Sequence, residues 1–286
     1  MVELELLLLA YDEDPVASRL KEHWGTPAAT GLRLDDSPIR ALAPGVGYVR
    51  RPGRHIFDEG VDRRLPEVLR ATTPTLVFPS IHRSEQQIEC LSAHPLGNPG
   101  PDAEVGGRAR TLVPTDPRRM ADALRRLDEG GRSLGLRATY EATHHGPEVA
   151  LPAFFVEIGY GTAPAPSPES VALLARVLPE IRPDPEDRVA LGVGGGHYAP
   201  HFTDLALRRR WAFGHLLSRH AFGALERATV EAAFALSPGA EGIVFARAED
   251  ARNPIFDGIA PRRRDQDAPR RGAPPTTSAS PPASGT

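Results

Sequence analysis

The sequence predicts an α/β fold with a mostly parallel sheet that is covered by helices on both faces. Short apolar runs typical of buried strands alternate along the chain with segments of helical periodicity. Several of the helical segments open with a capping residue followed by proline. The chain has 286 residues, 40% of them hydrophobic, which is enough for one large domain or two small ones.

The expected strands are continuous apolar runs, as in strands that are buried on both faces. The first run covers residues 2–11 and is far shorter than the roughly 20 residues that a membrane span needs. Further strands are expected at 46–50, 75–79, 136–143, 153–158, 189–193 and 242–245.

Helix starts are expected where Asp or Ser caps a helix and proline takes its first position. Apolar residues then recur every three or four positions, as on the buried face of a helix. These starts are Asp14-Pro15, Asp116-Pro117 and Ser167-Pro168. Further helices are expected at about 203–220 and 227–236.

Two stretches lack this periodicity. Residues 94–107 are rich in glycine and proline, which predicts a long surface loop. Residues 262–286 are mainly Arg, Pro, Ser, Thr and Ala, and they cannot bury enough apolar surface to offset their conformational entropy. We therefore expect a catalytic domain over 1–261 and a disordered tail over 262–286.

Charge and cysteine content narrow the function classes. The formal net charge of −3 combines +3 on residues 262–286 with −6 on the rest, which excludes a globally basic nucleic-acid binder but not a local basic patch. A single cysteine, Cys90, excludes an internal disulfide and a cysteine-based zinc site, so a metal would need His, Asp or Glu ligands. The chain opens without the pattern of a secretory signal, and we expect a cytoplasmic protein.

Polar residues gather where expected strands end, which is where ligands bind in parallel sheets. His144 and His145 close one strand and are followed by Gly-Pro, which turns the chain. Adjacent residues of an extended chain point to opposite faces, so both could face one site only if the turn twists the backbone. An ordinary strand end is the alternative interpretation.

A second cluster is the glycine run Gly194, Gly195 and Gly196 with His197 behind it, between an expected strand and a helix. Such a loop lets backbone N–H groups approach a phosphate, a carboxylate or an oxyanion. Its spacing fits neither a phosphate-binding P-loop nor the dinucleotide fingerprint, and a tight structural turn is the alternative.

The remaining clusters are Ser80-Ile81-His82-Arg83-Ser84, with His94 beyond it, and Glu157 at the end of another strand. A solvated loop and a structural ion pair are the respective alternatives. Five of the ten histidines therefore lie in strand-end or loop clusters: His82, His94, His144, His145 and His197. Imidazole ligates zinc, and zinc activates water, so a metal-assisted hydrolase is a natural interpretation, although no His-Glu-x-x-His spacing occurs.

The segments Glu141-Ala142-Thr143-His144-His145-Gly146-Pro147 and Gly194-Gly195-Gly196-His197-Tyr198-Ala199-Pro200 resemble the archaeal and plant type of D-aminoacyl-tRNA deacylase. The resemblance covers about residues 1–250 and includes Asp14-Pro15, the segment 80–84, His94-Pro95 and Gly214-His215. It departs from the family at His201 and at Arg219-His220, where the family has Lys and Lys-Tyr. Histidine in place of lysine makes the charge at position 201 depend on pH.

The resemblance implies hydrolysis of the ester of D-aminoacyl-tRNA, which releases free D-amino acid and keeps D-residues out of translation. It also implies a zinc cofactor and a single three-layer α/β/α domain of the phosphorylase and peptidyl-tRNA hydrolase type. The expected partner is the acceptor end of the tRNA, with no membrane and no obligatory protein partner.

Under this interpretation, metal binding or water activation falls to His144, His145 and His197, with His82 and His94 as further metal candidates. Glu157 would receive the substrate ammonium or orient a histidine. The expected substrate contacts are Gly194, Gly195, Gly196, Tyr198, His82 and Ser84. A metal-dependent amidohydrolase or peptidase on a small substrate and a non-catalytic RNA-binding module are the competing hypotheses.

Overall fold

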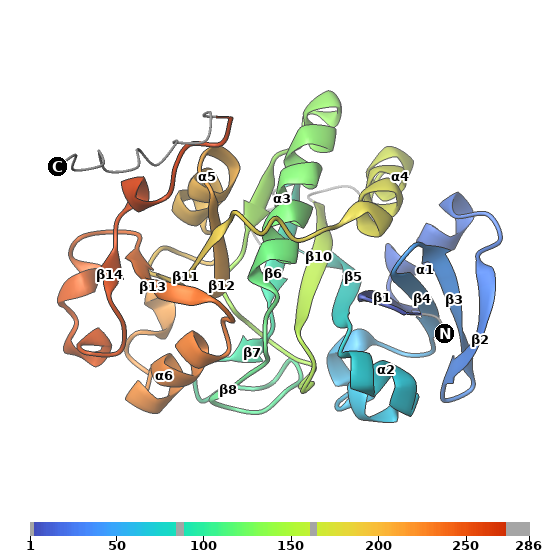
Figure 1. The fold of residues 1–286 in the computed structure, drawn as a ribbon, viewed down its shortest axis with the longest axis horizontal. Helices are drawn as coiled ribbons and strands as arrows, with labels where there is room; N and C mark the ends of the chain where they lie inside the picture. Colours follow the sequence, from blue (N-terminus) through green and yellow to red (C-terminus); the bar gives the residue numbers. More distant parts are fainter. Residues whose placement is uncertain (1–2, 84–88, 161–164, 273–286) are drawn as a thin grey trace, which may run out of the picture.

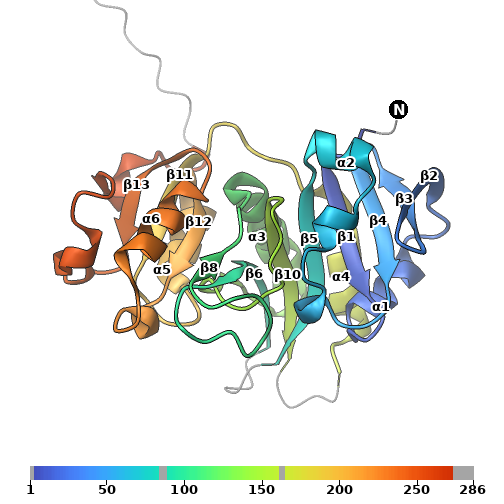
Figure 2. The same ribbon diagram turned by 90° about the horizontal axis from the view of Figure 1, so that it is seen from below.

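The computed structural model describes residues 3–83, 89–160 and 165–272. It contains a large and a small sheet that lie side by side, with helix α3 (Pro117–Gly131) packed against strands of both (Figures 1 and 2). The α/β class is therefore confirmed. Beside the expected mostly parallel sheet, the strands of the C-terminal third form a second, smaller sheet of their own.

The large sheet has the strand order β2-β3-β4-β1-β5-β10-β6-β9. Its centre is parallel: β4 (Val46–Arg51), β1 (Leu6–Tyr11), β5 (Thr75–Arg83) and β10 (Ala153–Tyr160). Antiparallel pairing occurs toward the edges, where β6 (Cys90–Pro95) joins β10 and where β3 (Ser37–Ala43) pairs with both β4 and β2 (Ala28–Leu34). The last strand, β9 (Ala138–Tyr140), is parallel to β6.

The small sheet is entirely parallel and has the order β12-β11-β13-β14. Its strands are β11 (Arg188–Val193), β12 (Trp211–Leu217), β13 (Ala240–Phe245) and the short β14 (Arg262–Arg263). A two-stranded ribbon of β7 (Gly97–Asn98) and β8 (Thr111–Leu112) lies apart from both sheets.

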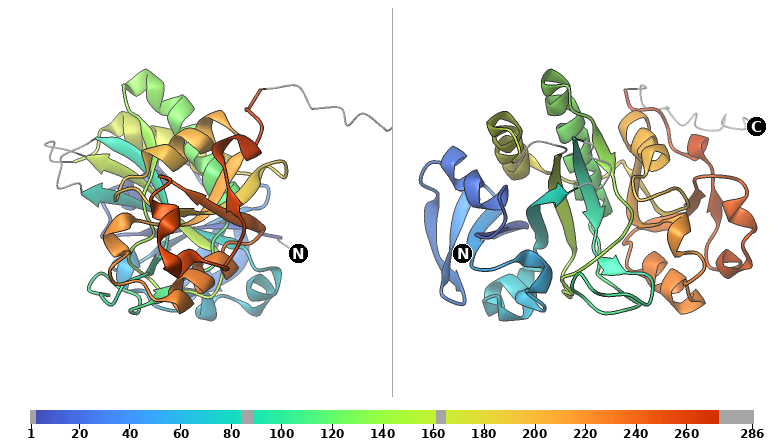
Figure 3. Two further views of the ribbon diagram at one scale, coloured as in Figure 1. Left: turned by 90° about the vertical axis from the view of Figure 1, so that its left-hand side faces the viewer. Right: turned by 180° about the vertical axis from the view of Figure 1, so that it is seen from behind.

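Helices cover the large sheet on both faces, because alternate residues of its central strands point to opposite layers. Val156 belongs to a core shared with α1 (Ala17–Leu20), α3 and α4 (Pro168–Val177), whereas its neighbour Phe155 belongs to a core shared with α2 (Glu67–Thr72). Helix α5 (Pro200–Arg208) joins the first layer and α6 (Arg227–Ala235) covers the small sheet (Figures 1 and 3). Among the described residues, no helix is long and apolar enough to cross a membrane.

Most expected elements are present within a few residues of their predicted bounds, and the proline-marked helices α3 and α4 begin as expected with side-chain caps from Asp116 and Ser167. The expected helix over 203–220 is wrong. Helix α5 ends at Arg208, and the segment behind it is the fully buried strand β12, which pairs with β11. An apolar run flanked by charges has no periodicity that separates a buried strand from a buried helix.

The expected loop over 94–107 is wrong at its start. His94 and Pro95 end strand β6, where His94 pairs with Phe155 and is fully buried. The hairpin of β2 and β3 was not foreseen at all.

The expected disordered tail is wrong for residues 262–272. Strand β14 pairs with β13, Ala268 is fully buried, and the backbone carbonyl of Pro269 accepts a hydrogen bond from Arg210. Arg271 lies 3.1 Å from the buried carboxylate of Asp187. Backbone pairing and an ion pair thus fix a segment whose composition offers few apolar side chains. Residues 273–286 lie outside the described part of the chain.

Candidate active site

The polar residues of the site lie beyond or near the ends of strands from both sheets. His82 lies on β5, His94 on β6 and Glu157 on β10. Glu141 follows β9 directly, and His197 follows β11 of the small sheet. Isolated bridges pair Glu141 with Tyr198 and Leu96 with His144, so the backbone itself holds the segments together.

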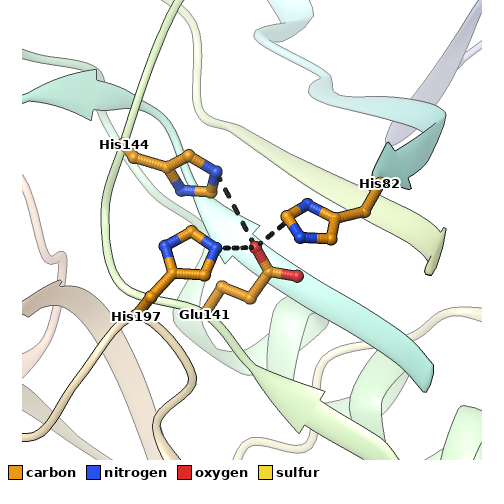
Figure 4. Close-up of side chains that lie close together, drawn as sticks. All are labelled: His82, Glu141, His144 and His197. Atoms are coloured by element: carbon orange, nitrogen blue, oxygen red, sulfur yellow. Dashed lines mark ion pairs between the residues drawn. The ribbon is translucent and has the colours of Figure 1, made fainter. Parts of the chain in front are cut away.

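Three histidines surround one carboxylate oxygen of Glu141 (Figure 4). Oε2 of Glu141 lies 3.0 Å from Nε2 of His197, 3.6 Å from Nδ1 of His82 and 3.7 Å from Nε2 of His144. Glu141 is fully buried, and within the described residues neither of its oxygens accepts a well-formed hydrogen bond. Burying an ionised carboxylate without well-formed hydrogen bonds costs folding free energy unless a cation neutralises it.

A second carboxylate, Glu157, lies beside the first group. Its Oε2 is 3.4 Å from Nδ1 of His82 and 3.5 Å from Nε2 of His94. Burial by itself would raise the pKa of Glu157, but contact with His82 and His94 outweighs it and holds the pKa well below its ordinary value. Glu157 is therefore ionised at neutral pH.

Backbone carbonyls fix the ring orientation of three histidines. Nδ1 of His144 lies 2.8 Å from the carbonyl oxygen of Ala142, Nδ1 of His145 2.7 Å from that of Gly146, and Nδ1 of His94 3.2 Å from that of Pro95. Because a carbonyl only accepts, each Nδ1 carries the hydrogen and each Nε2 of a neutral ring presents a lone pair. This is the arrangement by which proteins orient histidine ligands of metals.

Burial keeps the adjacent histidines uncharged. It lowers the pKa of His145 to about 4 and that of His144 well below its ordinary value, and the neighbouring histidines act in the same direction. For His82, the carboxylates of Glu157 and Glu141 outweigh burial and raise the pKa. At neutral pH, His144 and His145 are thus able to donate a lone pair to a metal.

His144 and His145 reach the same site because the backbone twists between them. His145 has a φ of +40°, and the rings lie 4.4 Å apart in an edge-to-face arrangement. An extended chain would have sent the second ring to the opposite face of the sheet.

The donor set suits zinc. One nitrogen from each of His82, His144 and His197 and one oxygen of Glu141 all lie within 4.8 Å of one another. Three imidazoles and a carboxylate are ligands that zinc accepts, and the unpaired Glu141 oxygens would be satisfied by a dication. Two further groups of the same kind share residues with this one: His94, His144 and His145, and His94, Glu141 and Glu157.

The glycine run lies beside His197. Gly194 and Gly195 have φ values of +104° and +79°, which residues with a side chain rarely adopt. A Cβ on Gly194 would meet the Asp250 carboxylate, so this glycine is required by packing, whereas a Cβ on Gly195 would meet nothing within 4 Å. The space beside Gly195 is therefore open for a ligand, whereas a Cβ on Gly196 would lie 3.7 Å from the carbonyl oxygen of Tyr198.

Tyr198 lies at the site as predicted, with its ring 5.4 Å from that of His197 and 6.1 Å from that of His82. Its hydroxyl is 3.9 Å from Cys90, and burial raises the pKa of that thiol to about 12. Cys90 is therefore not a thiolate nucleophile. Ser84 lies outside the described residues.

Two groups escaped the sequence interpretation. Glu141 belongs to a segment that carries the family resemblance, but the sequence around it does not show that histidines from other strands surround its carboxylate. His55 was not considered. Its Nε2 lies 3.3 Å from Oγ of Ser80, and Ser80 donates to Oδ2 of Asp14 at 3.0 Å. Since the Ser80 proton goes to Asp14, His55 donates rather than accepts, and Ser80 is not an activated nucleophile.

His215, one of the residues that carry the family resemblance, is not part of the cluster. It lies fully buried on β12, and its Nδ1 is 3.1 Å from Oγ1 of Thr143. His201, at the departure noted in the sequence, lies 3.4 Å from Asp265.

Comparison with known proteins places these residues in a family. Residues 70–256 match the family model described as D-aminoacyl-tRNA deacylase, and this range contains all the histidines and carboxylates of the cluster. The chain is 39% identical over 173 residues to the D-aminoacyl-tRNA deacylase of Thermoplasma acidophilum, which covers 60% of this chain and 67% of that protein. It is 33% identical over 210 residues to that of Pyrococcus abyssi, which covers 72% and 76%.

One solved structure is similar over nearly the whole chain. The crystal structure of AF0625, a conserved protein of unknown function, has a TM-score of 0.73 and 27% identity and covers 91% of both chains.

Proposed function

The chain belongs to the D-aminoacyl-tRNA deacylase family, and from this premise we propose that it hydrolyses the ester bond of D-aminoacyl-tRNA to free D-amino acid and tRNA. The observation that carries the proposal is the buried carboxylate of Glu141, which is surrounded by nitrogens of His82, His144 and His197 inside the matched range. A hydrolase needs such a preorganised set to activate water. The competing hypothesis of a small-substrate amidohydrolase has no support from the named relatives.

Zinc is the proposed cofactor, held by Glu141, His82, His144 and His197. When bound, it would supply a Lewis acid and lower the pKa of a water molecule. The unpaired buried oxygens of Glu141 and the carbonyl-fixed Nδ1 hydrogen of His144 support this assignment. His94 and His145 are the further ligand candidates, since they belong to the groups of possible metal ligands that overlap with this one.

The chain's own groups suit the rest of the substrate. The ionised Glu157 is a receptor for the free ammonium of the amino acid, because a buried negative charge at the site binds a cation. His145 is neutral at pH 7 and can take a proton from water as a general base. The open space beside Gly195 leaves room for a phosphate or the developing oxyanion.

The deciding experiment measures release of free amino acid from matched D- and L-aminoacyl-tRNA before chelation, after it, and after added zinc. We expect hydrolysis of the D-ester only, lost on chelation and restored by zinc. D-selective hydrolysis that survives chelation would support the deacylase activity and contradict the metal cofactor. Equal indifference to both esters would overturn the deacylase proposal. We also propose that the protein acts in the cytoplasm, where charged tRNA is used, and that it needs no obligatory protein partner.

A further inference from the structure

Exposed apolar side chains mark a place beside the site. Among the described residues, the exposed large hydrophobic side chains are Phe57 at 59%, Val105 at 47% and Leu134 at 37%. Phe57 and Val105 come from loops that touch, because the backbone of Gly106 packs so closely on the carbonyl of Ile56 that a Cβ on Gly106 would lie 1.8 Å from that oxygen. Two of the three exposed side chains thus lie on adjoining loops.

These loops are tied to the segment that carries His145. The amide of Gly146 donates to the carbonyl of Val105 at 3.1 Å, and the amide of Gly60 donates to the carbonyl of Glu148 at 2.8 Å. The carboxylate of Glu59 accepts from the amides of Gly107 and Glu148 and so links all three loops. The backbone segments that carry Phe57 and Val105 are therefore anchored to the segment that carries His145.

A cation lies beside the ring of Phe57. The guanidinium of Arg54 lies over its ring at 5.9 Å, Arg54 is exposed, and no ion pair within the described residues involves it. Of the nearby carboxylates, Asp58 pairs with Arg51 and Arg64, Glu148 pairs with Arg108, and Glu59 accepts hydrogen bonds from two backbone amides. An aromatic ring with a free cation beside it is the combination that binds single-stranded nucleic acid.

We propose that Phe57 and Val105 form a stacking platform for an unpaired base at the 3′ end of the tRNA, and that Arg54 contacts the adjoining phosphate. This rests on the proposed function. The scissile ester is carried by the terminal ribose, so when it lies at the histidine cluster the terminal bases and phosphates must lie at the rim. Two apolar side chains flanked by glycine and charged residues expose far less surface than the roughly 800 Å² that each partner buries in a stable protein interface. The area therefore suits a base better than a second protein.

The test compares Phe57→Ala with Leu134→Ala, which removes an exposed apolar side chain that follows α3 on the other face of the sheet. For each variant, kcat/KM is measured on D-aminoacyl-tRNA and on a D-amino acid ethyl ester, which has no base or phosphate. We expect Phe57→Ala to lower the ratio of the two values about tenfold, the size of one stacked base. Phe57→Trp should restore the ratio, and Leu134→Ala should not change it.

Binding gives an independent readout. Affinity for the trinucleotide CCA, titrated by fluorescence, should fall by a similar factor in Phe57→Ala. In Arg54→Ala, the salt dependence should fall by about 0.7 in the log–log slope, as for one lost phosphate contact on a single strand. Lys21→Ala, at an exposed cation on the far layer, is the control.

The outcomes separate this inference from the proposed function. Wild-type protein that hydrolyses no D-aminoacyl-tRNA contradicts the function, whereas an active wild type with equal ratios in Phe57→Ala and Leu134→Ala overturns the platform alone. An equal loss on both substrates, or a change of oligomeric state in Phe57→Ala, would also overturn it by making Phe57 a structural or protein-contact residue.

Discussion

Nε2 of His197 lies 3.0 Å from Oε2 of Glu141, although the two residues follow strands of different sheets. The contact is supported by the bridge between Glu141 and Tyr198 and by the hydrogen bond from the amide of Ala142 to the carbonyl of His197 at 2.8 Å. The site is therefore assembled only when the small sheet docks on the large one. Glu141 therefore takes part both in the candidate site and in the contact between the two sheets.

Glu141→Gln should remove the charge at the centre of the three histidines while keeping the shape. We expect zinc content measured by mass spectrometry to fall from stoichiometric to a small fraction, and hydrolysis of D-aminoacyl-tRNA to fall roughly 100-fold or more. We also expect added zinc to raise the Tm of the wild type but not that of Glu141→Gln, because a ligand that binds only the folded state stabilises it.

The control for that change is Glu129→Gln, which alters an exposed carboxylate on α3. It should bind zinc and hydrolyse ester as the wild type does. Full zinc content in Glu141→Gln would show that the metal, if present, is held by another of the histidine groups.

His145→Ala should separate proton transfer from metal binding. Because its neutral Nε2 is free, we expect kcat to fall roughly 10²- to 10⁴-fold, as on loss of a general base, with less effect on zinc content than His144→Ala. His23→Ala, at an exposed histidine, is the matched control. Equal zinc loss in both site variants would assign His145 to the metal instead.

Acid should destabilise the protein through His215. Burial lowers its pKa to about 3, whereas a histidine of the unfolded chain titrates near 6.5. Between these values the unfolded state binds the proton and the folded state does not, so stability falls as the pH falls from about 6.5 toward 3.

The measurement is urea unfolding of wild type and His215→Gln at pH 6.5 and 4.5. We expect the variant to lose about 2 kcal/mol less of its unfolding free energy over this interval. His23→Gln should lose as much as the wild type. Parallel losses in all three proteins would rule out His215 as the source.

Truncation distinguishes the packed segment from the residues behind it. Removal of 273–286 takes away none of the contacts described above, and we expect an unchanged Tm. Removal of 262–286 also deletes β14, the buried Ala268 and the pairing of Arg271 with Asp187. We expect this to cost about 2–4 kcal/mol and several degrees of Tm in a calorimetric scan. Equal Tm values for the two truncated proteins would show that residues 262–272 do not contribute to stability.

The sequence by itself determined the α/β class, the helices marked by proline and most buried strands, because apolar periodicity and caps are local properties. It also singled out most of the residues that lie together in the candidate site. His82, His144, His145, His197 and Glu157 were found from their positions at strand ends, where parallel sheets collect polar groups.

Only the tertiary structure decided which of these residues meet. The role of Glu141, the burial of His94 in β6 and the packing of Arg271 depend on partners tens of residues away. The choice of strand over helix at β12 likewise depends on pairing with β11, since its apolar run suits both. Local sequence sets which face of an element is apolar, but docking of the two sheets sets which charges are left together in the interior.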